Sequence, residues 1–230
     1  VIHDTGVDAE ISIHRRDIDS LILENGYLSA SESLAILGQG GIGKSRLVMQ
    51  LALFACVNRE CFGWKTDGVN KKWLFLQTEN GPRRLRSDLI KMKSAFNPDE
   101  WLRIQDHVFI HSIEEAEDGI LLLNEEKFFQ KAQIAVEAYD PDVIVFDPLR
   151  DFHSRDLNAD VEMSAAYRNI VKLSRSNGRV DRAIIILHHA KTGKAGISKA
   201  VGYERSDFGR NSKALHGCAR AQINVSPGLP

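Results

Sequence analysis

The sequence predicts an α/β fold, with a mostly parallel, twisted sheet covered by helices on both faces. From residue 33 onward, short apolar runs with the composition of β-strands alternate with longer stretches of helical spacing. This order produces parallel strands joined by crossover helices. A glycine-rich turn also joins the first of these strands directly to the first helix, as is common in this fold class.

The strands and helices follow from apolar spacing and from the residues that end each run. Strands are expected at residues 33–37, 73–78, 108–113, 143–146, 183–188 and 221–225. Helices are expected at residues 44–57, 83–96, 125–138 and 161–176, with Pro82 and Asp160 near two helix starts. Because 230 residues can bury one continuous core, we expect a single catalytic domain at residues 33–230.

Residues 1–32 have no clear hydrophobic period, although residues 17–23 favour a short helix. We therefore expect an N-terminal extension that packs on the main domain. Hydrophobic residues make up 43% of the chain, but no apolar run is long enough to cross a bilayer, so a membrane protein is not expected.

Charge and cysteine content narrow the expected partners and compartment. The net charge of -1 gives no overall basic field, so any contact with nucleic acid must come from local loops. Cys56, Cys61 and Cys218 are spaced for neither a zinc site nor a disulfide framework, which favours a reducing compartment and a cytoplasmic location.

A phosphate-binding loop (P-loop) with the pattern G-x-x-x-x-G-K-S directly follows the first predicted strand. Glycines in such a loop adopt positive φ angles, which turn successive N–H groups toward a phosphate at a helix N-terminus. The lysine should reach the β- and γ-phosphates, and the serine hydroxyl should bind Mg²⁺. We expect ATP and Mg²⁺ to bind Gly38, Gln39, Gly40, Gly41, Ile42, Gly43, Lys44, Ser45 and Arg46.

Two carboxylates end apolar strands and complete the expected hydrolytic site. Asp147 follows four apolar residues and precedes Pro148, so we interpret it as the acidic Walker B residue that orders Mg²⁺ together with Ser45. Glu79 ends the strand that follows the first helix, where it can orient or deprotonate the attacking water. The alternative is that each is only a solvated strand-end acid.

Two adjacent histidines, His188 and His189, end the strand predicted at residues 183–188. Neighbouring residues of a strand point to opposite faces, so this pair does not predict a zinc site. One of them is positioned to sense the γ-phosphate beside the P-loop. The alternative is a pair of merely polar strand-end residues.

These motifs together resemble the RecA/DnaB class of P-loop ATPases, and within it the RepA replicative helicase family. The resemblance covers residues 33–225 and rests on the P-loop, on Glu79, on Asp147 with the Pro-Leu-Arg that follows it, and on the segment from His188 to Lys191. It implies a RecA-like core, ATP hydrolysis with Glu79 as the catalytic carboxylate, and a homo-oligomeric ring, usually a hexamer, with nucleotide between subunits.

The resemblance also implies two sites outside the phosphate loop. A neighbouring subunit of such rings supplies an arginine finger, for which Arg220 is the first candidate and Arg210 the second. The loop after the histidines would contact single-stranded DNA through Lys191, Lys194 and Lys199. A flexible, lysine-rich loop that is merely solvated is the alternative.

The sequence therefore predicts a Mg²⁺-dependent ATPase that acts as a ring-forming helicase or helicase-like motor in DNA replication. A regulatory or scaffold ATPase of the same fold, whose nucleotide state controls partner binding without translocation, is the alternative. A small-molecule or nucleotide kinase also uses a P-loop, but the strand-end Glu79 and the absence of an arginine-rich lid sequence count against it.

Overall fold

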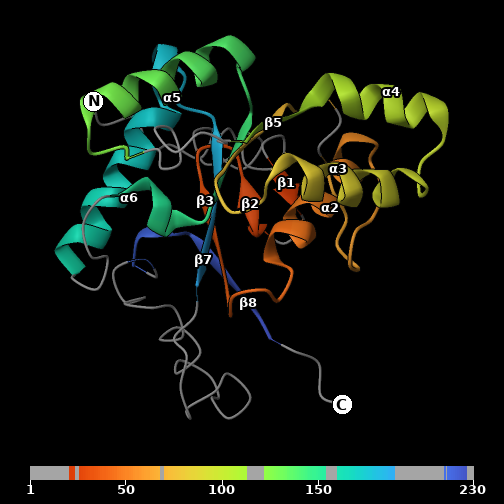
Figure 1. The fold of residues 1–230 in the computed structure, drawn as a ribbon, viewed down its shortest axis with the longest axis horizontal. Helices are drawn as coiled ribbons and strands as arrows, with labels where there is room; N and C mark the ends of the chain where they lie inside the picture. The colour runs from red at the N-terminus through yellow and green to blue at the C-terminus, as the bar shows by residue number, and fades with distance from the viewer. Residues whose placement is uncertain are drawn as a thin grey trace, which may run out of the picture.

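The computed structural model describes residues 21–23, 26–67, 70–112, 122–153, 160–189, 215 and 217–226. Within these ranges a six-stranded parallel sheet has the order β5-β4-β6-β7-β3-β8. Helices cover both of its faces (Figure 1). The predicted α/β class is confirmed.

The strands begin at the residues that the apolar runs predicted. In the central strands β3, β4, β6 and β7 nearly every residue is buried, as expected for a parallel sheet covered on both faces, whereas the edge strands β5 and β8 are only partly buried. They are β3 (Ser33–Gly38), β4 (Trp73–Gln77), β5 (Val108–Ser112), β6 (Val143–Asp147), β7 (Ala183–His189) and β8 (Ala221–Val225).

Helices α2, α3 and α4 lie on one face of the sheet, and α5 and α6 lie on the other (Figure 1). Each face has its own buried apolar cluster. In the described part of the chain, no helix combines the length and apolar character needed to cross a membrane. The helices are α2 (Lys44–Cys56), α3 (Pro82–Lys93), α4 (Pro98–His107), α5 (Glu126–Tyr139) and α6 (Asp160–Ser174), and the short 3₁₀ turns are η2 (Leu149–Phe152) and η3 (Ser176–Gly178).

Helix α4 was not predicted from the sequence, and within it only Ile104 is buried. Its start is fixed by a capping box instead. The Asn97 side chain accepts a hydrogen bond from the Glu100 backbone N–H, and the Glu100 carboxylate accepts one from the Asn97 N–H, both at 2.9 Å. Pro98 occupies the first turn, where its missing N–H costs nothing.

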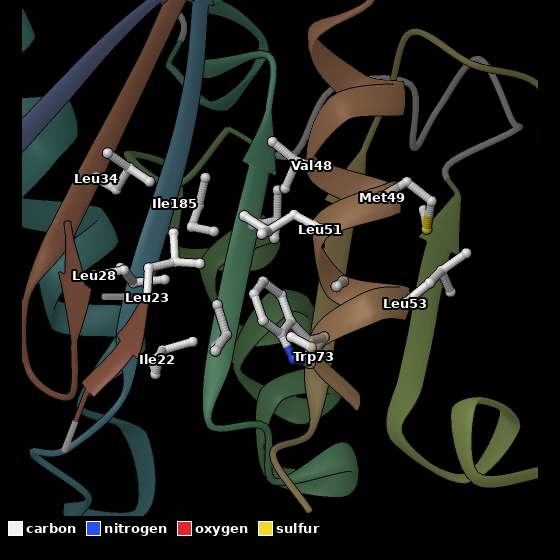
Figure 2. Close-up of a cluster of buried hydrophobic side chains, with 14 of the residues drawn as sticks. Ile22, Leu23, Leu28, Leu34, Val48, Met49, Leu51, Leu53, Trp73 and Ile185 are labelled. Atoms are coloured by element: carbon white, nitrogen blue, oxygen red, sulfur yellow. The ribbon is translucent and has the colours of Figure 1, made fainter. Parts of the chain in front are cut away.

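The N-terminal part contains a small antiparallel hairpin of β1 (Leu21–Leu23) and β2 (Leu28–Ser29). The prediction of a short helix at residues 17–23 was therefore wrong for residues 21–23, and residues 17–20 lie outside the described ranges. Burial explains the difference, because Ile22 and Leu23 pack into the same cluster as Ile185 and are almost fully buried (Figure 2). Tertiary burial here outweighs local helical spacing.

The pairing of neighbouring strands ends at different heights along the sheet. The β3–β7 pairing extends to Gly38 opposite His189, and the β4–β6 pairing extends to Asp147, whereas the β6–β7 pairing stops at Phe146 opposite Ile186. The strand ends therefore separate between β6 and β7. The P-loop lies on one side of this separation and the two candidate acids lie on the other.

Candidate functional site

The P-loop joins β3 to α2 and has the backbone geometry that phosphate binding requires. Gly41 and Gly43 have φ angles of 75° and 95°, which side-chain-bearing residues rarely adopt. Among the described residues no side chain caps α2, and the first turn of this helix contains no acidic residue. Its first N–H groups and the positive end of its dipole therefore remain available to an anion.

Lys44 is buried at the start of α2, where its Nζ donates hydrogen bonds to the carbonyl oxygens of Gly38 at 3.0 Å and Gln39 at 2.9 Å. Burial lowers the pKa of Lys44, while the nearby charges of Asp147 and Glu79 oppose this shift. Both hydrogen-bond acceptors are neutral carbonyls. A triphosphate would supply the negative charge that they lack, so the P-loop fits this group.

Ser45 and Asp147 provide two oxygen groups that suit Mg²⁺. Asp147 ends β6 with only 4% exposure and accepts a side-chain hydrogen bond from Ser45. Burial raises the pKa of Asp147 to about 6, because few polar groups replace the water around its charge. A hard cation bound by carboxylate and hydroxyl oxygens would stabilise that charge.

Glu79 follows β4 and receives two hydrogen bonds on the same oxygen. Arg150 Nη2 donates to its Oε1 at 2.9 Å, and His189 Nε2 lies 3.0 Å from the same atom. The His189 ring also lies against the P-loop, because a Cβ added to Gly40 would be 3.8 Å from two of its ring atoms. His189 therefore bridges the P-loop and the candidate catalytic carboxylate.

Arg150 is a site residue to which the sequence analysis assigned no role, although it ends the Pro-Leu-Arg that follows Asp147. It lies in η2, directly after the Walker B strand, and its Nε donates to Asp151 Oδ1 at 3.2 Å. Asp151 in turn accepts a hydrogen bond from the Thr78 hydroxyl. The arginine thus joins the loop after β6 to the loop after β4. Because its partner Glu79 is distant in sequence, no short-range pattern indicates the pair.

A cavity of about 350 Å³ connects the P-loop to the acids and continues between α2 and α3. Arg46 and Asp88 of α3 both line this cavity and form a bidentate ion pair, in which Arg46 Nε and Nη2 each donate to a carboxylate oxygen at 2.8 Å. The P-loop and strand-end residues that line the cavity are Gly41, Gly43, Lys44, Ser45, Arg46, Gln77, Glu79, Asn80 and Asp147.

The remaining predicted residues lie away from this cavity or outside the described ranges. His188 is buried within β7 at 3% exposure and does not line the cavity. Arg220 precedes β8 and donates its backbone N–H to Ser33, at the opposite end of β3 from the P-loop. Arg210 and the loop lysines Lys191, Lys194 and Lys199 fall outside the described residues.

The distance between Arg220 and the P-loop follows from the strand register. Leu34 pairs with Ala221 and Gly38 pairs with Val225, so Arg220 lies the full length of β8 from the loop, roughly 15 Å at about 3.3 Å per residue. Its side chain is exposed and lies 3.4 Å from Glu32. The fold therefore does not bring Arg220 to the P-loop of its own chain.

Residues 6–195 match the model of an AAA domain family. No curated protein matches the chain in sequence. Among solved structures, the fold is similar to that of a KaiC-like protein from the hyperthermophilic archaeon Pyrococcus horikoshii OT3, with a TM-score of 0.51 and 13% identity over 89% of this chain and 76% of that one. The chain therefore belongs to the AAA domain family and has a RecA-like P-loop fold.

Proposed function

We propose that this protein hydrolyses ATP with Mg²⁺ and uses Glu79 as the catalytic carboxylate. The proposal is based on the observation that Lys44, Ser45, Glu79 and Asp147 line one and the same cavity. These residues come from the C-terminal ends of three strands of one parallel sheet, the edge where ligands bind in open α/β folds.

Binding in this proposal relies on the P-loop and on the two oxygen groups beside it. The N–H groups at the start of α2 hold the phosphates, and Lys44 exchanges its two carbonyl acceptors for phosphate oxygens. Ser45 and Asp147 hold the metal ion. When bound, Mg²⁺ neutralises charge on the phosphate oxygens.

Hydrolysis then depends on Glu79, which orients a water molecule and accepts its proton. The water oxygen forms a bond to the γ-phosphorus while the bond to the bridging oxygen of the leaving ADP breaks. The proton is passed on to the released phosphate. Lys44 and an arginine in trans, Arg220, stabilise the charge on the transferred phosphoryl group.

The biological role that we propose for this hydrolysis is a ring-forming helicase or helicase-like motor in DNA replication, as in the RepA family that the sequence resembles. Arg220 lies the length of β8 from its own P-loop, so the arginine-finger role that we propose for it requires a neighbouring subunit. A hexamer and single-stranded DNA as a partner belong to this proposal. The alternative remains a regulatory ATPase that does not translocate.

The E79Q variant tests the catalytic proposal, with E137Q on the opposite face of the sheet as a matched control. E79Q should bind an ATP analogue normally but turn over ATP at least about a hundredfold more slowly, the usual contribution of a general base. E137Q should retain wild-type turnover. Near-normal turnover by E79Q would remove Glu79 from this role.

The motor and regulatory roles are separated by ATPase assays with and without single-stranded DNA. The motor proposal expects DNA to stimulate turnover, and expects K191A and K194A to weaken both DNA binding and that stimulation. Unchanged binding and stimulation in both variants would remove the proposed DNA loop. Mass measurement with ATP and DNA tests the ring, and a monomer under every condition would refute it.

A further inference from the structure

Buried residues before and after Arg150 in the sequence hold it at the edge of the phosphate site. Leu149 and Phe152 are buried and fix η2 against the sheet, so Arg150 between them points outward. Asp151 orients one edge of the guanidinium through Nε, and Glu79 accepts from another edge through Nη2. The guanidinium is therefore pre-oriented beside the carboxylate that we assign to water activation.

The contact with Arg150 and His189 places Glu79 in a resting arrangement. Both groups use Oε1, and within the described part of the chain Oε2 accepts no hydrogen bond. The two donors to Oε1 therefore fix the orientation of the Glu79 carboxylate. Release of one donor would let the carboxylate turn and present an oxygen to the attacking water.

The Arg150–Glu79 pair is suited to exchange because it is not enclosed. The side chains of Arg150 and Glu79 are 54% and 32% exposed, and ion pairs this open to water are weak. A γ-phosphate carries more charge than a carboxylate and matches the planar fork of a guanidinium. Arg150 already influences the phosphate site, because its charge contributes to the lowered pKa of Lys44.

We propose that Arg150 is an arginine that acts within its own subunit: it holds Glu79 in the nucleotide-free protein and transfers to the γ-phosphate when ATP binds. The transfer leaves Glu79 free to orient water at the moment when a substrate is present. Arg150 forms no covalent bond, and the atoms exchanged in hydrolysis are those described above. This inference rests on the proposed ATPase activity, and it adds an arginine that is distinct from Arg220.

The experiment compares R150A and R150K with R103A, an exposed arginine on α4. Turnover of ATP is measured, together with the affinities for ADP and for a non-hydrolysable ATP analogue. R150A should lose roughly a hundredfold or more in kcat, the scale of one preorganised charge-stabilising donor. It should weaken the ATP analogue about tenfold or more, the scale of one charge-assisted hydrogen bond, and leave ADP affinity unchanged. R150K should recover part of both losses, and R103A should match the wild type.

A second set of variants separates contact with phosphate from action through Glu79. In the E79Q background, R150A should still weaken the ATP analogue relative to ADP, because the proposed contact is with the γ-phosphate itself. If that selective loss disappears in E79Q, Arg150 only positions Glu79 and the transfer is refuted. Equal losses for ADP and the ATP analogue, or unchanged kcat, would also refute it. A wild-type protein that neither binds the analogue nor hydrolyses ATP would instead refute the underlying ATPase proposal.

Discussion

Replacing Asp147 by asparagine should stabilise the metal-free protein and at the same time abolish its ATPase activity. Asp147 is buried at the end of β6, so when Mg²⁺ is removed its ionised form has lost hydration that no metal ion offsets. Asparagine has nearly the same shape, can still accept a hydrogen bond from Ser45, and carries no charge at any pH. The variant therefore removes the cost of a buried charge without creating a cavity.

The magnitude follows from the pKa of Asp147, which burial raises from an ordinary value of 3.8 to about 6. That difference corresponds to about 3 kcal/mol of preference for the protonated carboxyl in the folded state. Between about pH 4 and pH 6 the folded protein binds this proton more tightly than the unfolded chain does, so stability falls as the pH rises through this window. Above about pH 6, the buried charge lowers the stability of the folded protein by the full amount of about 3 kcal/mol.

Urea denaturation in EDTA, without nucleotide, measures the effect, and D106N on the exposed side of α4 serves as the control. At pH 7.5, D147N should be more stable than the wild type by about 3 kcal/mol, and by about half as much at pH 5. Mg²⁺ should narrow the gap by stabilising only the wild type. A D147N variant that is less stable at pH 7.5, or a gap that does not change with pH, would refute the reasoning.

Three further predictions concern other parts of the fold. G38A should lose roughly 1–3 kcal/mol of stability in urea denaturation, because its Cβ would lie 2.9 Å from a β8 carbonyl oxygen. G81A has nothing within 4 Å of the added Cβ and should lose less than about 1 kcal/mol, since the poorer N-cap is offset by the lower entropy of the unfolded chain. Equal losses would contradict this account. F152A should cost about 3–5 kcal/mol of stability and also lower kcat, because it loosens the turn that carries Arg150. An F152A protein that is fully folded in the assay and still has the wild-type kcat would contradict the effect on catalysis. R220A should be nearly inactive alone but regain activity when mixed with K44A, and a mixture no more active than its components would exclude an arginine in trans.

The sequence contained most of what was needed to predict the sheet and the P-loop. Buried parallel strands are continuous apolar runs, and the residue that begins each run begins the strand, as at Trp73 and Val143. The P-loop is a local motif whose glycine angles follow from its own residues. Such signals act over a few neighbouring residues and do not depend on the rest of the fold.

The features that sequence reasoning missed depend on contacts between distant segments or on capping. Helix α4 is short and buries only Ile104, and the clearest local mark of its start is the Asn97–Glu100 capping box, which sequence reasoning overlooked. The hairpin strand β1 is buried in the same apolar cluster as residues of β7, which is distant in sequence. The Arg150–Glu79 contact requires β4 and β6 to be neighbours in the sheet, which no local pattern specifies.

The early end of the β6–β7 pairing has a mechanical consequence for the site. Among the described residues, no ladder pairing joins β6 and β7 beyond Phe146 and Ile186, so β3 with β7 and β4 with β6 form two separately paired halves on the loop side of the sheet. One half carries Lys44 and the other carries Asp147, and a nucleotide that spans them would tie the halves together where the backbone does not. Release of the phosphate would remove this link, so each round of hydrolysis would make the loop edge of the sheet less stiff.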